Sequence, residues 1–89
     1  MKTVYILTIT SNTRSLFDKD CNHCIMGVYS TYEKAKANVV AKMQEYVAEY
    51  FYDGNLPAEA VDDNWEATYH HTKYTTMHLS ALVTPYEVE

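Results

Sequence analysis

The stretch Ser30-Thr-Tyr-Glu-Lys-Ala-Lys-Ala-Asn-Val-Val-Ala-Lys-Met-Gln-Glu-Tyr-Val-Ala-Glu-Tyr-Phe51 decides the fold of this 89-residue chain. It contains no glycine or proline and is rich in alanine, lysine and glutamate, which favour helices. Ser30 and Glu33 have the spacing of a capping box, in which each side chain bonds to a backbone N–H of the first turn. Gly54 stands where a left-handed C-terminal cap is common, and Pro57 prevents the helix from restarting. The stretch therefore predicts one long helix.

Apolar side chains gather on one broad face of this helix when residues are placed at about 100° per position. That face holds Tyr32, Ala35, Val39, Val40, Met43, Tyr46, Val47 and Tyr50. A stripe of this width usually covers one side of a sheet. We therefore expect the helix to pack on a sheet of its own domain rather than to bind a partner.

Alternating apolar and polar residues predict four strands, two before the helix and two after it. The strands are expected at residues 3–10, 23–29, 65–74 and 76–84. Residues 11–22 and 52–64 have the composition of loops, and the last two strands should form a hairpin that turns at Tyr74-Thr75. The order ββαββ predicts an α+β fold, with an antiparallel four-stranded sheet and one long helix packed on one face.

The second strand has two features that affect which side chains point inward. Cys24, Met26 and Val28 should share one face, with Ile25 and Tyr29 on the other. Gly27 either weakens this strand or marks a bulge. The sheet face away from the helix should stay open, and it is a natural surface for dimerisation or for a partner.

The length and the net charge of the chain limit the number of domains and the kinds of partner that we expect. Eighty-nine residues make a single domain, residues 1–89, and no apolar run approaches the roughly 20 residues that span a bilayer. The N-terminus lacks a small-residue cleavage site, so we expect no signal peptide, no membrane partner and a cytoplasmic location. A net charge of −5 disfavours direct binding to nucleic acid and suits a basic protein partner.

Two cysteines and the histidines form the first candidate site. Cys21-Asn-His-Cys24 has the spacing of half a zinc site, to which His71 and His78 could add ligands. The chain has no second C-x-x-C, so two reduced thiols are the simpler interpretation. A cross-strand pair of His71 and His78 would also suit acid–base chemistry. The chain has no nucleophile elbow and no glycine-rich phosphate loop, so we expect no enzymatic activity and no cofactor, with zinc as the alternative.

The second candidate site is the acidic window, residues 44–66, which contains no lysine or arginine. It holds seven of the twelve acidic residues, and two of them, Glu49 and Asp53, lie where the negative end of the helix dipole disfavours them. Aromatic residues interleave with the acids and would serve as anchors for a basic protein surface. The residues expected to bind a partner are Glu45, Glu49, Tyr50, Tyr52, Asp53, Glu59, Asp62, Asp63, Trp65 and Glu66. The simpler interpretation is a solvated acidic loop with Trp65 in the core.

Gly27-Val-Tyr-Ser-Thr-Tyr-Glu-Lys-Ala35, together with Tyr5-Ile-Leu7, resembles small phage and bacterial domains in which a strand ending Gly-Val-Tyr-Ser enters a helix opening Ser-x-x-Glu-Lys-Ala. The match covers about a third of the chain, mostly the strand-to-helix junction, and it implies a small strand–strand–helix–strand unit without catalytic residues to carry over. The tyrosine-rich acidic half departs from that pattern. By size and charge the chain is also similar to phage-encoded inhibitors of bacterial defence, such as anti-CRISPR proteins.

These observations lead to three hypotheses. The first is a non-enzymatic protein that uses the acidic window to block a basic, nucleic-acid-binding site on a bacterial defence protein, in the host cell if the chain is phage-encoded. The second is a small metal- or ligand-binding domain built on Cys21, Cys24 and a histidine. The third is a homodimeric structural domain that pairs through the open face or edge of its sheet.

Overall fold

The computed structural model describes residues 2–14, 19–52 and 54–88, and the side chains of these residues outside 14–22. Two strands come first, β1 (Lys2–Arg14) and β2 (Lys19–Tyr29). Two helices, α1 (Tyr32–Ala37) and α2 (Val39–Tyr50), and a short 3₁₀ turn, η1 (Ala58–Ala60), follow. The chain ends in β3 (Glu66–Thr72) and β4 (Thr75–Val88). Among the described residues no helix has the length and apolar character needed to cross a bilayer.

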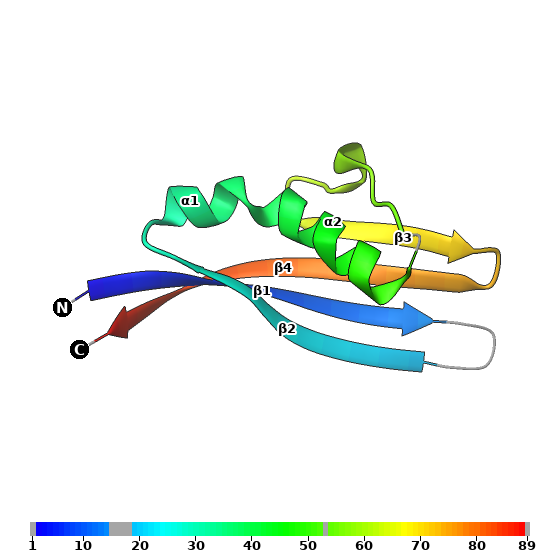
Figure 1. Cartoon of the computed structure of the whole chain (residues 1–89), viewed down its shortest axis with the longest axis horizontal. Helices are drawn as coiled ribbons and strands as arrows, with labels where there is room; N and C mark the ends of the chain where they lie inside the picture. Colours follow the sequence, from blue (N-terminus) through cyan, green and yellow to red (C-terminus); the bar gives the residue numbers. More distant parts are fainter. Residues whose placement is uncertain (1, 15–18, 53, 89) are drawn as a thin grey trace.

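The four strands form one antiparallel sheet in the order β2-β1-β4-β3, and the helices lie across one of its faces (Figure 1). The predicted α+β class and four-stranded antiparallel sheet are therefore confirmed. The predicted single long helix is wrong in detail, because the helix breaks at Asn38. The Asn38 side-chain amide donates to the Lys34 carbonyl at 2.8 Å, so a side chain takes over one helical acceptor at the break.

The helix ends also differ from the prediction. Thr31, rather than Ser30, caps α1, since its hydroxyl accepts from the Lys34 backbone N–H at 3.1 Å. At the other end Phe51 leaves α2 in an extended conformation. Gly54 is not a left-handed cap, because neither glycine of the chain has a positive φ.

The strands run further than the alternation pattern predicted. Residues 11–14 and 19–22, expected in a loop, continue the β1–β2 ladder. The polar composition misled the prediction because Ser11 and Thr13 point into the core, where they are buried. At the other end, β4 continues to Val88 through Pro85, where β3 no longer flanks it. A proline is tolerated there because no neighbour on that side needs its N–H.

A bulge in β2 changes the faces of its last residues. Leu7 pairs with Gly27 and Thr8 pairs with Ile25, so Met26 is an extra residue. After it, Val28 turns to the open face and is 60% exposed, whereas Tyr29 packs against the core. The expectation that Val28 shares a face with Cys24 is therefore wrong, and the alternative that Gly27 marks a bulge is confirmed.

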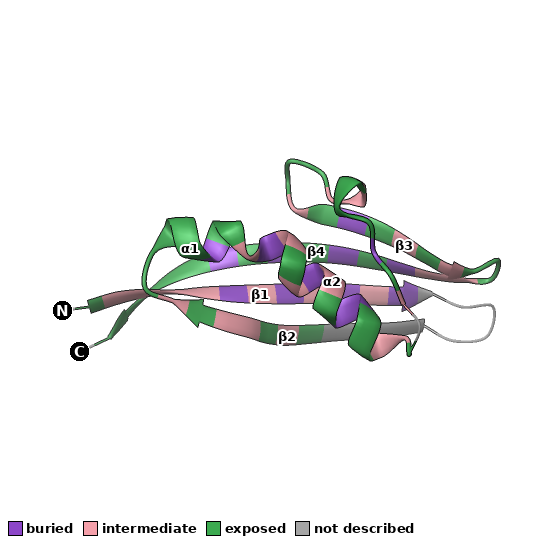
Figure 2. Cartoon of the chain, turned by 45° about the horizontal axis from the view of Figure 1, so that its top comes forward, coloured by how far each residue is buried: buried purple, intermediate pink, exposed green. Residues whose placement is uncertain are grey.

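The core lies between the helices and one sheet face. The helix contributes Ala35, Val39, Met43, Tyr46 and Val47, and the sheet contributes Leu7, Ile9, Ala67, Met77, Leu79, Ala81 and Val83. Figure 2 shows buried and exposed residues alternating along β4, as expected for a strand with one covered face. Inside this layer the Ser11 hydroxyl and the Tyr46 phenol are 2.6 Å apart and form a buried hydrogen bond.

Candidate protein-binding surfaces

The acidic window divides into two groups that lie toward opposite ends of α2 (Figures 1 and 2). Glu45 and Glu49 are exposed on the second half of α2. Glu59, on η1, and the turn that leads into β3 form the other group. Asp53 lies outside the described residues.

The α2 group is partly neutralised by its own helix. Lys42 Nζ lies 3.0 Å from a Glu45 carboxylate oxygen, and this is the only ion pair within the described part of the chain. The hydrogen bond and charge of Glu45 raise the pKa of Lys42 above its ordinary value. Glu49 lines a cavity of about 240 Å³ between α2 and β2, together with Cys24, Met26, Tyr46 and Tyr50.

Most aromatic residues of the window are structural. Tyr50 is half-buried, and Phe51 stacks on the His71 ring with centroids 4.0 Å apart and an interplanar angle of 12°. Trp65 is half-buried with its ring 6.3 Å from that of Tyr32. Only Tyr52 is fully exposed among these rings in the described structure. Tyr52 is therefore the aromatic residue best placed to meet a partner.

The turn before β3 is built around Asp62. Its Oδ1 accepts from the backbone N–H groups of Asn64 at 2.9 Å and Glu66 at 3.0 Å, and its own N–H donates to the Glu66 carbonyl at 2.9 Å. Trp65 completes the turn with a positive φ of 59°, which is a strained conformation for a bulky residue. One Asp62 oxygen is thus committed to holding the turn, whereas Asp63 is exposed on it.

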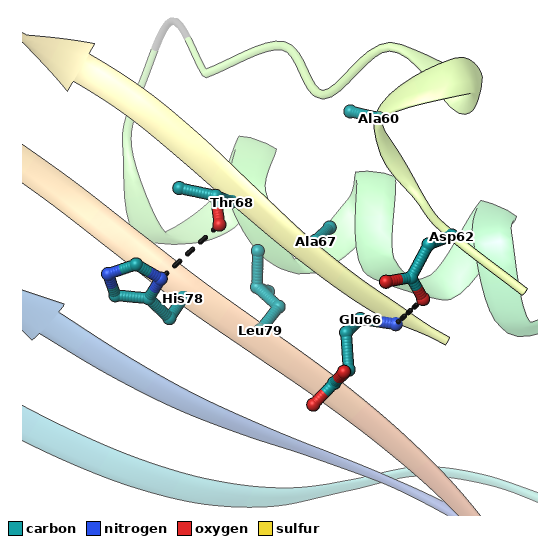
Figure 3. A pocket seen from close by; sticks show the side chains of 7 residues that line it. All are labelled: Ala60, Asp62, Glu66, Ala67, Thr68, His78 and Leu79. Carbon is teal, nitrogen blue, oxygen red and sulfur yellow. Dashed lines mark hydrogen bonds between the residues drawn. The ribbon is translucent and has the colours of Figure 1, made fainter. Parts of the chain in front are cut away.

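A groove of about 550 Å³ lies beside this turn and is bordered by β3 and β4 (Figure 3). It is lined by Ala60, Asp62, Glu66, Ala67, Thr68, His78 and Leu79. The figure shows the Glu66 side chain reaching from β3 toward β4, the Thr68 and His78 side chains meeting between these two strands, and the Asp62 carboxylate at the start of β3. We call this space the edge groove. Sequence reasoning identified Asp62 and Glu66 but missed Thr68, because its role depends on strand register.

The edge groove includes residues of the edge strand β3, which has a neighbour only in β4. The Trp65 carbonyl accepts from the Ala81 N–H at 2.9 Å, so alternation directs the backbone groups of Glu66, Thr68 and His70 away from β4. Asp62 takes both outward groups of Glu66. Within the described structure, no backbone bond from outside the sheet reaches Thr68 or His70.

The predicted metal ligands do not come together. Cys24 pairs with the buried Ile9 and faces the core, whereas His78 is exposed on the opposite sheet face, where its ring bonds to Thr68 at 3.3 Å. The alternative of a cross-strand His71–His78 pair is wrong, because the register places His78 opposite Thr68 and His71 faces the core. The Cys21 side chain lies outside the described ones. No group of three metal-ligating side chains forms among the residues that the structure describes.

Three of the four histidines lie on the open sheet face, each beside a threonine of the neighbouring strand. His23 bonds to Thr10 at 3.1 Å, and His70 bonds to Thr76 at 3.3 Å, in the same way as His78 bonds to Thr68. Each pair stands directly opposite in the ladder. These pairs could not be predicted from the sequence, because the register that forms them depends on the bulge and on the turn lengths.

No known protein family, curated protein or solved structure matches the chain.

Proposed function

We propose that the chain is a non-enzymatic protein-binding module that holds a basic segment of a partner in the edge groove. The observation that carries this proposal is the pairing of two carboxylates, Asp62 and Glu66, with the free edge of β3 in one groove. Neither carboxylate forms an ion pair within the described structure. The groove is thus ready to accept positive charge.

The partner segment binds in an extended conformation. Thr68 and His70 direct backbone N–H and C=O groups outward, and an added strand can satisfy such groups. An arginine of that segment would reach Glu66, since guanidinium groups bind carboxylates through two parallel hydrogen bonds. Backbone pairing would supply the orientation and the carboxylates would supply the preference for a basic sequence.

A basic nucleic-acid-binding protein of a bacterial host is the partner class that fits this chemistry. Such proteins present arginine and lysine clusters that neutralise phosphates. An acidic chain that occupied such a cluster would act as a nucleic-acid mimic and block it. This role is the one expected from the similarity in size and charge to phage-encoded inhibitors, and it would be carried out in the cytoplasm.

The test uses a fluorescein-labelled peptide of alternating arginine and threonine as the probe, with anisotropy as the readout. The double variant Asp63→Lys/Glu66→Lys should weaken binding by at least about 10-fold, because it puts lysines in place of one groove carboxylate and of the exposed carboxylate on the adjoining turn. Asp62 is left intact because it holds the turn. The matched control, Glu33→Lys/Glu87→Lys, makes the same change in net charge at exposed positions outside the acidic window.

The control variant should bind the probe within about 2-fold of the unaltered chain once salt screens long-range attraction. Amide shifts in an NMR titration should centre on residues 66–70. Equal loss of binding in both double variants would mean that only net charge attracts the probe, and the proposal would be abandoned. Shifts spread over α2 instead of β3 would also contradict it.

A further inference from the structure

The open face of the sheet carries an apolar surface that the helices do not cover. Six side chains form it, from β1, β2 and β4: Val4, Ile6, Ile25, Val28, Leu82 and Tyr86. Ile25 is 64% exposed and Leu82 is 63% exposed. Ile25 and Leu82 both pair with Thr8, so they lie on either side of β1 in one row across the sheet. We call these six residues the open-face patch.

We propose that a second copy of this chain covers the open-face patch, so that two sheets pack face to face in a homodimer. The open-face patch shares no residue with the lining of the edge groove, and this inference does not depend on the proposed function. It is carried by the size of the face and by the distribution of charge.

The area of the face matches what a stable dimer needs. The three strands that would face the second copy, β1, β2 and β4, contain 13, 11 and 14 residues. At about 3.3 Å per residue and about 4.8 Å between strands, they cover about 600 Å². Two such faces bury about 1,200 Å² in total, the area at which standard-size interfaces begin. Covering these three strands with an equal surface therefore gives an interface at the lower end of the standard range.

The charge of the face favours a second copy over a basic or acidic partner. Among the described side chains of this face, only Lys2 and Glu66 are charged, and both lie at its margins. The interior consists of the open-face patch and of threonine, serine, asparagine and histidine side chains. Depletion of charge marks the centre of protein interfaces. The exposed acids on α2 and η1 lie with the helices on the other side of the sheet, where they do not oppose association (Figure 1).

A two-fold axis that runs parallel to the strands above β1 would bring the open-face patches of the two copies into contact. β2 and β4 flank β1 at the apolar end, because β3 stops short of it. The axis would set Ile6 against the partner's Ile6 and Ile25 against the partner's Leu82. Isologous contacts of this kind need a surface that is complementary to itself, which a flat uncharged sheet provides. Aligned sheet packing would place the two faces about 10 Å apart.

Sedimentation equilibrium of the full chain tests the inference. The substitution Leu82→Glu should raise the dimer dissociation constant by at least about 30-fold, the loss expected when a central interface anchor is disrupted. The side chain is largely exposed in the protomer, so the fold should survive, as circular dichroism will show. Tyr52→Glu is the matched control, since it adds the same charge at a fully exposed aromatic residue beyond the end of α2 and should leave the constant unchanged.

Ile25→Thr is a second, milder variant at the same row and should raise the dissociation constant less than Leu82→Glu does. A chain that remains monomeric near millimolar concentration overturns the inference. So does a dimer whose dissociation constant Leu82→Glu leaves unchanged, because another surface would then hold it. The arginine–threonine probe should still bind the Leu82→Glu variant, so failure of the dimer and failure of the edge groove are separable.

Discussion

The buried hydrogen bond between Ser11 and Tyr46 links the sheet to α2, and its loss should weaken the fold measurably. The two oxygens are 2.6 Å apart, and Ser11 is only 1% exposed. Tyr46→Phe keeps the ring and removes the phenol oxygen, so the Ser11 hydroxyl stays buried without this partner. An unsatisfied buried hydroxyl costs about 1–3 kcal/mol, and we expect a loss of about 1.5 kcal/mol in the free energy of unfolding.

The partner substitution separates the hydrogen bond from packing. Ser11→Ala leaves the Tyr46 phenol without its partner, and because Tyr46 is 8% exposed we expect a smaller loss, about 1 kcal/mol. The double variant should lose less than the sum of the two, since neither oxygen remains unsatisfied. The difference, about 1 kcal/mol, is the coupling energy of the pair.

Urea titration followed by circular dichroism, at one protein concentration, gives the unfolding free energies. In thermal scans Tyr46→Phe should lower Tm by about 6–12 °C for a chain of this size. Tyr50→Phe is the control, since its ring stacks beside Tyr46 and its hydroxyl makes no hydrogen bond in the described structure. A loss for Tyr46→Phe no larger than for Tyr50→Phe, or strictly additive losses in the cycle, would refute the reasoning.

Three further predictions concern turns and charge. Asp62→Ala should lower the unfolding free energy by about 1–2 kcal/mol, because two backbone N–H groups lose their acceptor, and urea titration will show it. Gly54→Ala should cost about 1–3 kcal/mol, since a Cβ there would lie 2.5 Å from a backbone carbonyl of α2; Gly27→Ala should cost less, because its nearest neighbour is the movable tip of a tyrosine ring. The raised pKa of Lys42 means that its ion pair stabilises the fold at neutral pH and that this contribution disappears as pH rises above about 10.5. Glu45→Gln should return the Lys42 pKa toward its ordinary value in an NMR titration, and an unchanged pKa would contradict the assignment of its cause.

Periodic parts of the fold were predictable because a single physical rule governs them. The inward residues of β4, such as Met77 and Leu79, alternate strictly, and both are buried. The helix stripe is equally regular, and its central residues Val39, Met43 and Val47 are buried. In both cases burial of one face selects one period, so the order of apolar and polar residues identifies the element and its buried side.

The ends and breaks of the helices and strands were not predictable, because at each of them two local conformations have nearly equal free energies. Ser30 and Thr31 are both good caps, and only the path of the chain from β2 selects Thr31. Asn38 lies on the polar side of the helix, where the sequence pattern does not reveal that its side chain displaces a backbone bond. The length of β1 was missed because Ser11 is buried through its bond to Tyr46, a contact between residues 35 positions apart.

The candidate site was also predictable only in part. The run of acids without lysine or arginine is plain in the sequence, and it includes both carboxylates of the edge groove. Their grouping depends on the Asp62 turn, which sets Glu66 and Thr68 along a free edge. The open-face patch also needs the register, since it joins residues of three strands.

The extra residue in β2 limits which changes in chain length this protein can accept. Met26 shifts the phase of the strand by one position, so that Val28 points outward and the Tyr29 ring points inward just before the chain enters α1. Deleting Met26 would restore an unbroken ladder with Thr8 opposite Ile25 and Leu7 opposite Gly27, so Val28 and Tyr29 would keep their faces. An added residue, by contrast, would turn the Tyr29 ring out of the core and Val28 into it unless the strand formed a second bulge. For this strand, therefore, loss of the one extra residue should be tolerated, whereas insertions between Cys24 and Tyr29 should be far less tolerated than substitutions.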